Sequence, residues 1–421
     1  MLSLRNRLLL GLLLLTALVP LLAALLDGRR AAPVPAPENS PPQPSPRVLT
    51  GADVLAREGA ARLRGKRVGL ITNQTGRTAD GRRTIDVLAQ AEGVKLVALF
   101  SPEHGPEGTL TGTVADAADA ATGLRIYSLY GKTRRPTADM LEGLDVLVFD
   151  IQDAGVRYYT YITTMAYAME EAARLGIEFV VLDRPNPLGG EGVEGPMLDP
   201  DRVNFEGYFP LPLRYGMTLG ELAQLFNQTN EIGARLTVVR LEEWRRAQWF
   251  DDTGLDWIPP SPNLKTLAGV KFYPAVELLR AGDVSVGRGT DAPFEQFGAP
   301  WMDGGKVAAY LEARAVPGVR FTVVEFTPAT DVHAGKLCRG VRLELTDRDA
   351  LPIGRLGMEL ISALGRLYPN DFRLDATIRL VGSKKTIERL QAGDDPVDIV
   401  AGWREELAAF RKLRERYLLY E

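Results

Sequence analysis

Short apolar runs alternate with helical patterns through the first half of the chain. The apolar runs, rich in β-branched residues, cover 67–72, 94–100, 145–151 and 177–183. Helical segments lie between them at 83–91 and 159–175. Buried strands that alternate with helices are typical of a parallel sheet covered on both faces. The pattern therefore predicts an α/β fold with a Rossmann-like parallel-sheet domain over residues 49–215.

The second half of the chain lacks this regular alternation. Thr218-Leu219-Gly220-Glu221 has the pattern of a capping box at the start of a helix that reaches Phe226. The other segments predicted here are strands at 235–240, 319–325 and 340–346 and helices at 304–314, 353–367 and 398–417. This order predicts a second, smaller α+β domain over residues 216–421. Its loops at 260–263 and 285–291, dense in glycine, proline and polar residues, can reach across to the first domain.

The N-terminal segment has a different pattern from the rest. Arg5 and Arg7 precede an uncharged apolar run at 8–26. This order is typical of a signal peptide or an N-terminal membrane anchor, predicted here over residues 1–30, and the missing small-x-small cleavage site favours the anchor. The proline-rich segment 31–48 is predicted to be a linker. We therefore expect an extracytoplasmic protein of the periplasm or cell envelope, secreted or anchored, whose N-terminal segment can contact the membrane.

Composition changes the picture in three ways. The length of 421 residues exceeds what one hydrophobic core usually supports, which agrees with two domains. The net charge of -4 and the lack of a dense basic stripe argue against a nucleic-acid partner. Cys338 is the single cysteine, so no internal disulfide can form, and we expect its side chain to be buried and inert.

Polar residues follow each of the four predicted strands of the first domain. The segments are Asn73-Gln74-Thr75-Gly76, Ser101-Pro102-Glu103-His104-Gly105, Asp150-Ile151-Gln152-Asp153 and Asp183-Arg184-Pro185-Asn186-Pro187. Ligands of open α/β sheets bind outside the carboxyl ends of the strands. Glu103 and His104, one of two histidines in the chain, therefore predict the start of an active site.

Several common kinds of site do not match this sequence. The loop after the first strand lacks G-x-G-x-x-G, and the chain lacks a G-x-x-x-x-G-K-[ST] loop, so no nucleotide cofactor is expected. The two histidines are far apart, which disfavours a metal site. A serine esterase would need a G-x-S-x-G turn, which is missing.

The motifs at the strand ends, together with Tyr130-Gly131, Arg157-Tyr158-Tyr159-Thr160-Tyr161 and 285–294, resemble the exo-β-N-acetylmuramidases of the NamZ type from about residue 51 to 420. The resemblance implies a two-domain hydrolase with an active-site cleft between the domains. It also implies release of N-acetylmuramic acid from the non-reducing end of peptidoglycan fragments, with Glu103 as the catalytic acid. A non-catalytic peptidoglycan-binding or glycan-binding protein of the cell envelope is the alternative.

Glycoside cleavage needs an acid that protonates the leaving oxygen and usually a second carboxylate. The candidates for the second carboxylate are Asp150, Asp153, Asp183, Glu194 and Asp291. Asp153 can take the base role or pair with Arg157, whereas Asp150 and Asp183 can cap the turns that follow their strands. His104 can orient Glu103, contact the substrate or belong to a turn.

An arginine at the cleft suits the lactyl carboxylate of muramic acid, and Arg157, Arg184 and Arg288 are the rival carriers of this role. Tyr158 can stack on a sugar ring or pack into the core. Trp244, Trp249, Trp257 and Trp301 can form a glycan platform, although scattered tryptophans more often belong to the core. The predicted substrate-binding set is Asn73, Asp150, Gln152, Arg157, Tyr158, Asp183, Arg184, Asn186, Asn263, Arg288 and Asp291.

Overall fold

The computed structural model describes residues 47–421 as one compact unit. The predicted signal or anchor at 1–30 and nearly all of the predicted linker at 31–48 lie outside these residues. Within the described part, no helix combines the length and the apolar character needed to cross a membrane.

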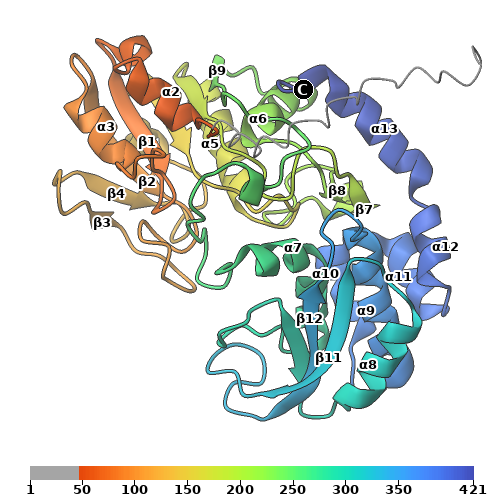
Figure 1. Cartoon of the computed structure of the whole chain (residues 1–421). Coiled ribbons are helices and arrows are strands. Elements are labelled where there is room, and N and C mark those ends of the chain that lie inside the picture. The colour runs from red at the N-terminus through yellow and green to blue at the C-terminus, as the bar shows by residue number, and fades with distance from the viewer. Residues whose placement is uncertain (1–46) are drawn as a thin grey trace, which may run out of the picture. The chain divides into compact units, whose positions relative to one another are not determined.

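A seven-stranded sheet forms the first lobe of this unit (Figure 1). In spatial order its strands are β3 (Ala117–Ala118), β4 (Arg125–Ser128), β2 (Lys95–Ser101), β1 (Arg67–Thr72), β5 (Val146–Asp150), β6 (Glu178–Leu182) and β9 (Leu236–Val239). Every neighbouring pair is parallel except β3 and β4. The predicted Rossmann-like sheet is therefore confirmed, and the strand order reverses direction at β1 and β5.

The alternating side chains of these strands face two separate cores. In β5, Val146 and Val148 pack with α2 (Gly51–Arg57) and α3 (Thr84–Gln90) on one face. Leu147 and Phe149 of the same strand belong to the larger core on the other face, which includes residues of α5 (Tyr161–Arg174) and α6 (Leu219–Thr229). Because helices cover both faces, the central strands β1, β5 and β6 are mostly apolar and buried.

The predicted start of the second domain at Gly216 precedes two elements that complete the first lobe. The capping box at Thr218 is confirmed, since its side chain accepts from the Glu221 N–H and the Glu221 carboxylate accepts from the Thr218 N–H. Helix α6 then leads into β9, which pairs with β6 as the last strand of the sheet. The sequence placed this strand in the second domain because one β-branched run carries no signal of which sheet it joins.

The second lobe contains a three-stranded antiparallel sheet in the order β10 (Gln296–Ala299), β12 (Cys338–Leu345) and β11 (Val319–Phe326). Helices α8 (Gly304–Ala313) and α9 (Ile353–Leu367) pack beside it, and α7 (Leu267–Val276) lies between the two sheets (Figure 1). The other elements are α4 (Ala138–Leu141), the β7 (Glu194–Met197) and β8 (Pro212–Arg214) ribbon, α10 (Ile378–Val381), α11 (Lys384–Gln391), α12 (Pro396–Ala401) and α13 (Arg404–Arg414). Six short 3-10 helices, η1–η6, are Ala61–Leu63, Pro200–Arg202, Phe250–Asp252, Glu277–Gly282, Leu374–Thr377 and Glu415–Tyr417.

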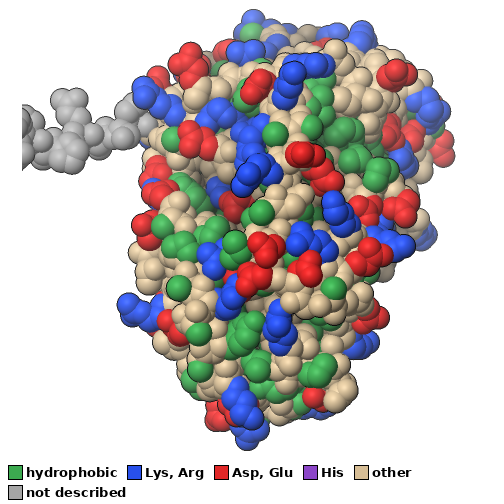
Figure 2. All heavy atoms as spheres, turned by 90° about the vertical axis from the view of Figure 1, so that its right-hand side faces the viewer, with side chains coloured by type: hydrophobic (Ala, Val, Ile, Leu, Met, Phe, Trp, Pro, Cys, Tyr) green, Lys and Arg blue, Asp and Glu red, His purple; other side chains and the backbone are tan. Residues whose placement is uncertain are grey.

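The predicted single helix at 398–417 is wrong. The chain forms α12 and α13 instead, and the N–H of Gly402, which follows α12, is shared among the carbonyls of its last turn. Apolar residues of the two lobes form one contiguous core that includes Phe149 of β5 and Leu360 of α9. Acidic and basic side chains are interspersed on the face shown in Figure 2.

Candidate active site

A cleft of about 560 Å³ opens where the carboxyl end of the first sheet faces the second lobe. Glu103 and His104 follow β2, and Thr160 immediately precedes α5. The remaining side chains that line it come from both lobes and include Tyr130, Tyr158, Glu206, Asn263, Tyr273, Glu277, Arg280, Arg288, Asp331 and Arg379. The volume lies within the range of about 300–1,000 Å³ that is typical of small-ligand sites.

The backbone and the side chain of Glu103 are both held in place. The Thr160 hydroxyl donates to Glu103 Oε2 over 2.6 Å. The Tyr161 hydroxyl lies 3.2 Å from the Glu103 carbonyl oxygen and 2.6 Å from that of Pro260, and it accepts from Asn73 Nδ2. Glu103 Oε2 therefore has a hydrogen-bond partner in the protein, whereas Oε1 is available to contact a ligand in the cleft.

His104 adopts a left-handed backbone conformation, with φ of 71°. Its Nδ1 lies 2.8 Å from the carbonyl oxygen of Leu110, and its own carbonyl accepts from the Leu110 N–H over 3.1 Å. Because a carbonyl only accepts, Nδ1 carries the proton, and in the neutral ring Nε2 is an acceptor. The two bonds close the loop between these residues and hold the imidazole at the wall of the cleft.

Four carboxylates line the cleft, and three of them are paired with arginines. The pairs are Glu206 with Arg379, Glu277 with Arg288 at 2.6 Å, and Asp331 with Arg280 at 3.0 Å. Within residues 47–421, Glu103 is the cleft carboxylate that makes no ion pair. Burial, with the nearby negative charge of Glu103, raises the pKa of Tyr130 to about 12, so this phenol keeps its proton beside the carboxylate.

Five of the predicted site residues line this cleft: Glu103, His104, Tyr158, Asn263 and Arg288. Tyr158 is mostly buried, and its hydroxyl donates to the carbonyl of Tyr273, so that one part of the ring belongs to the core. The guanidinium of Arg288 is held by the buried Glu277.

The carboxylates that end β5 and β6 have structural partners instead of access to the cleft. Asp150 is fully buried and accepts from Arg184 Nε at 2.6 Å and from the Thr84 hydroxyl at 2.5 Å. Asp183 is also fully buried. It accepts from the Thr218 and Tyr420 hydroxyls and from the Gly220 N–H. The expectation that Asp150, Asp183 and Arg184 contact the substrate therefore has no support in this geometry.

Asp153, the predicted catalytic base, is buried away from the cleft. Its Oδ2 accepts from the Tyr215 hydroxyl and from the Gly155 N–H, whereas Oδ1 has no hydrogen-bond partner. Its expected alternative partner, Arg157, is bonded elsewhere. Burial raises the pKa of the Asp153 carboxyl to about 6. The geometry thus corrects the prediction of a base, because Asp153 does not line the cleft that holds Glu103.

The raised pKa of Asp153 predicts a pH effect on stability. A carboxyl that titrates near pH 6 when folded and near 3.8 when unfolded binds its proton more tightly in the folded state. Its contribution to the free energy of unfolding is therefore largest below pH 4 and is lost as the pH rises to 6, by about 3 kcal/mol. Replacing Asp153 by asparagine should remove this loss in denaturation curves measured from pH 4 to 7. The exposed Asp139→Asn variant is the control, and parallel curves for wild type and Asp153→Asn would contradict the effect.

Arg157 does not reach the cleft or pair with Asp153, which corrects its prediction as the lactyl-carboxylate ligand. Its guanidinium is 1% exposed and donates to the carbonyls of Pro196, Leu211, Leu380 and Val381. Asn73 and Asn186 are likewise structural, since each side-chain oxygen accepts from the N–H two residues further on.

The remaining candidates lie outside the cleft. Asp291 is exposed, and Glu194 pairs with Arg214. Within the described residues, no tryptophan lines the cleft. Trp244 and Trp249 are buried core residues. Cys338 is buried, as predicted, and burial raises the pKa of its thiol to about 11.

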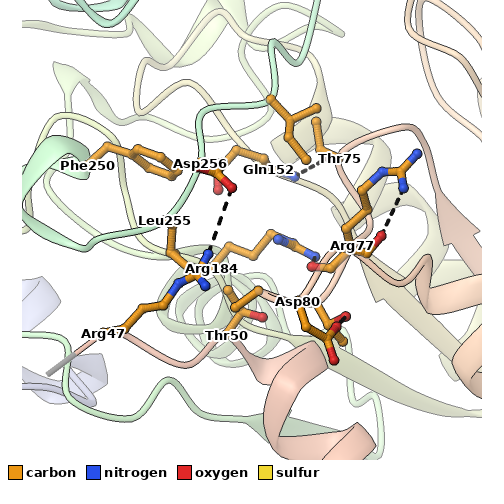
Figure 3. Close-up of a pocket in the computed structure, with 14 residues that line it drawn as sticks. Arg47, Thr50, Thr75, Arg77, Asp80, Gln152, Arg184, Phe250, Leu255 and Asp256 are labelled. Carbon is orange, nitrogen blue, oxygen red and sulfur yellow. Dashed lines mark hydrogen bonds and ion pairs between the residues drawn. The ribbon is translucent and has the colours of Figure 1, made fainter.

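Gln152 and Arg184 line a second, smaller cavity of about 170 Å³ at the same sheet edge (Figure 3). The view shows Arg184 directed between Thr50 and Arg77, with Arg47 and Asp256 at the other side, 4.0 Å apart. Its acidic residues are Asp80 and Asp256, and Asp256 is 95% exposed. Asp80 is exposed as well, whereas Glu103 is partly buried, so this cavity does not offer the kind of acid that the cleft offers.

Several cleft residues were not singled out by the sequence. Thr160 and Tyr130 lie in motifs that carried the family resemblance, so a closer reading of those motifs could have found them. Arg280, Asp331, Arg379 and Glu206 carry no local signal, because segments far apart in the chain bring them together.

Comparison with known proteins agrees with the fold and the cleft. Residues 68–268 match the N-terminal domain and residues 271–420 the C-terminal domain described as exo-β-N-acetylmuramidase NamZ. The peptidoglycan β-N-acetylmuramidase NamZ of Bacillus subtilis is 44% identical over 380 residues, covering 89% of this chain and 92% of that protein.

Two crystal structures of DUF1343 family proteins from Bacteroides fragilis are also similar. Their TM-scores are 0.82 and 0.74 at 38% and 31% identity, and each comparison covers 89% of this chain and 99% of that structure. The predicted fold and the predicted glycoside hydrolase class are thereby confirmed. Matched over both of its lobes, this chain belongs to the exo-β-N-acetylmuramidase NamZ family of glycoside hydrolases.

Proposed function

We propose that this enzyme releases N-acetylmuramic acid from the non-reducing ends of peptidoglycan fragments, with Glu103 as the general acid. The observation that carries the proposal is that Glu103 lies in the cleft without an ion-pair partner. Among the four cleft carboxylates, it is the one without an arginine partner in the described chain. The activity named for the relative from Bacillus subtilis supports the choice of substrate.

The arrangement around Glu103 suits proton donation to a glycosidic oxygen. Thr160 fixes Oε2, which leaves Oε1 to carry the proton toward the leaving group. The other three cleft carboxylates have oxygens engaged by arginines, so they are less free than Glu103 to approach a glycosidic oxygen. Tyr130 and His104 Nε2 then lie within the same wall to contact the sugar.

We also propose that the enzyme acts outside the cytoplasm. The basic flank and apolar run of residues 1–30 support export or anchoring, and peptidoglycan is found outside the cytoplasmic membrane. Detection of the full chain in the cell-envelope fraction tests this setting, and recovery in the cytosol contradicts it.

Two isomeric disaccharides provide a direct test of the activity. We expect free N-acetylmuramic acid from muramic acid β-1,4-linked to N-acetylglucosamine, and no cleavage of the isomer with N-acetylglucosamine at the non-reducing end. Mass spectrometry identifies the released sugar. Cleavage of the second isomer would contradict exo-muramidase specificity. Binding of both disaccharides without turnover would favour the alternative of a glycan-binding protein.

A further inference from the structure

We propose that Arg280 binds the lactyl carboxylate of the sugar and thereby distinguishes N-acetylmuramic acid from N-acetylglucosamine, an inference that rests on the proposed function. Muramic acid differs from glucosamine by a lactyl ether that carries a carboxylate. A cleft that selects this sugar therefore needs a cation with free N–H groups. Three arginines line the cleft, and their hydrogen bonds separate them.

Arg288 and Arg379 can offer a second carboxylate one terminal nitrogen, Nη1, and not the edge that bears both terminal nitrogens unshared. Arg288 donates from Nε and Nη2 to the buried Glu277, and its Nη1 lies 3.8 Å from Asp331. Arg379 donates from Nε and Nη2 to Glu206, in an exposed pair across the two lobes. Each guanidinium thus gives one complete edge to a protein carboxylate.

Arg280 is bonded differently. Its Nε lies 3.0 and 3.1 Å from the two carboxylate oxygens of Asp331, and within residues 47–421 its Nη1 and Nη2 have no hydrogen-bond partner. The end of the guanidinium that bears both terminal nitrogens is the edge that holds a carboxylate through two parallel bonds. This edge belongs to a side chain that lines the cleft and is 36% exposed.

The partner of Arg280 fixes the direction of that edge. Asp331 has φ of 71°, and its Oδ1 accepts from the Val332 N–H over 2.7 Å. Its loop packs on Gly289, where an added Cβ would lie 2.5 Å from the Thr330 nitrogen, and the Ala329 N–H donates to the Gly289 carbonyl. The carboxylate that holds Arg280 is therefore itself held by the backbone.

An arginine that already holds one carboxylate can accept another, and this chain contains examples. Arg83 donates to Asp86 from Nε and Nη2 and to Asp119 from Nη1. Arg314 likewise donates to Glu359 and Asp395. The bond to Asp331 thus orients Arg280 and leaves its two terminal nitrogens free to donate. The lactyl carboxylate of the substrate would be the second carboxylate that Arg280 binds.

The test compares two aryl β-muramosides, one with the free lactyl acid and one with the acid converted to its primary amide, which has nearly the same shape and no charge. For wild type we expect kcat/KM to favour the acid by about 10- to 100-fold. Arg280→Gln should reduce this ratio to near one, chiefly by slowing turnover of the acid. Arg280→Lys should keep part of the preference, because lysine keeps the positive charge and loses the two parallel N–H donors of the guanidinium.

The distant, exposed Arg320→Gln is the control and should retain the wild-type ratio. Asp331→Asn should lower the ratio part of the way, because Asp331 orients Arg280. An unchanged ratio in Arg280→Gln overturns the assignment, as does loss of the ratio in Arg379→Gln with Arg280→Gln unaffected. If wild type cleaves neither muramoside, the proposed function fails first. Because the ratio is measured within each variant, partial loss of folded protein does not change it.

Discussion

Replacing Glu103 by glutamine should lower kcat/KM for muramic-acid-terminated disaccharides by about 10²- to 10⁴-fold, the usual loss when a general acid is removed. Glutamine keeps the shape of the side chain and can still accept from the Thr160 hydroxyl through its carbonyl oxygen. It has no acidic proton to give to the glycosidic oxygen. The folded structure should therefore persist while the leaving sugar departs unprotonated. Rates of N-acetylmuramic acid release by purified protein measure the effect.

The leaving group separates an acid from other roles of Glu103. An aryl leaving group with a low pKa departs without protonation, so the Glu103→Gln variant should keep far more activity on a dinitrophenyl muramoside than on the disaccharide. Glu107→Gln is the matched control, because Glu107 lies in the same loop and is exposed. Equal losses on both substrates would mean that Glu103 binds the sugar or attacks it and does not donate the proton.

The fold was largely predictable because its signal is local. Strands buried on both faces are apolar throughout, and those of the first sheet stand out between helices whose lengths fit crossovers. The position of β9 was not predictable in this way, because only its parallel pairing with β6 places it in the first sheet. The break between α12 and α13 was not predictable either, because it falls inside a pattern that is helical on both sides.

The site was predictable only where a single loop supplies neighbouring site residues. Glu103 and His104 are adjacent in the sequence and remain adjacent in the cleft. The other strand ends carry equally polar residues, but Asp150 and Asp183 turn inward to hold Arg184 and Thr218. A sequence shows that a polar residue follows a strand, and it does not show whether the side chain meets solvent or a partner. Arg280 and Asp331 lie 51 positions apart, so no spacing could join them.

Removal of Arg157 should destabilise the protein more than any surface change. Its Nη1 donates to the carbonyls of Pro196 and Leu211 at the β7–β8 ribbon, and its Nη2 to those of Leu380 and Val381 in α10. All four distances lie between 2.8 and 2.9 Å. Gly382 packs so closely that an added Cβ would lie 2.7 Å from Nη2. One buried cation therefore joins the ribbon of the first lobe to a helix of the second.

Arg157→Met keeps much of the side-chain volume and leaves four buried carbonyls without a donor. Burial lowers the pKa of Arg157 to about 10, which is still well above neutral pH, so the guanidinium stays charged while it donates to the four carbonyls. We expect the free energy of unfolding to fall by about 3–5 kcal/mol, as when one member of a buried charged network is removed. Urea denaturation followed by circular dichroism measures this change.

A matched comparison separates a structural tie from a ligand contact. Arg379 also joins the two lobes, but its pair with Glu206 is exposed, so Arg379→Gln should cost no more than about 1 kcal/mol. Arg157→Lys should lie between the two, because an ammonium has three donors for four carbonyls. Folded Arg157→Met should keep the wild-type preference for the free lactyl acid over its amide. Unchanged stability with a lost preference would instead restore Arg157 as the carboxylate ligand, which its full set of backbone partners argues against.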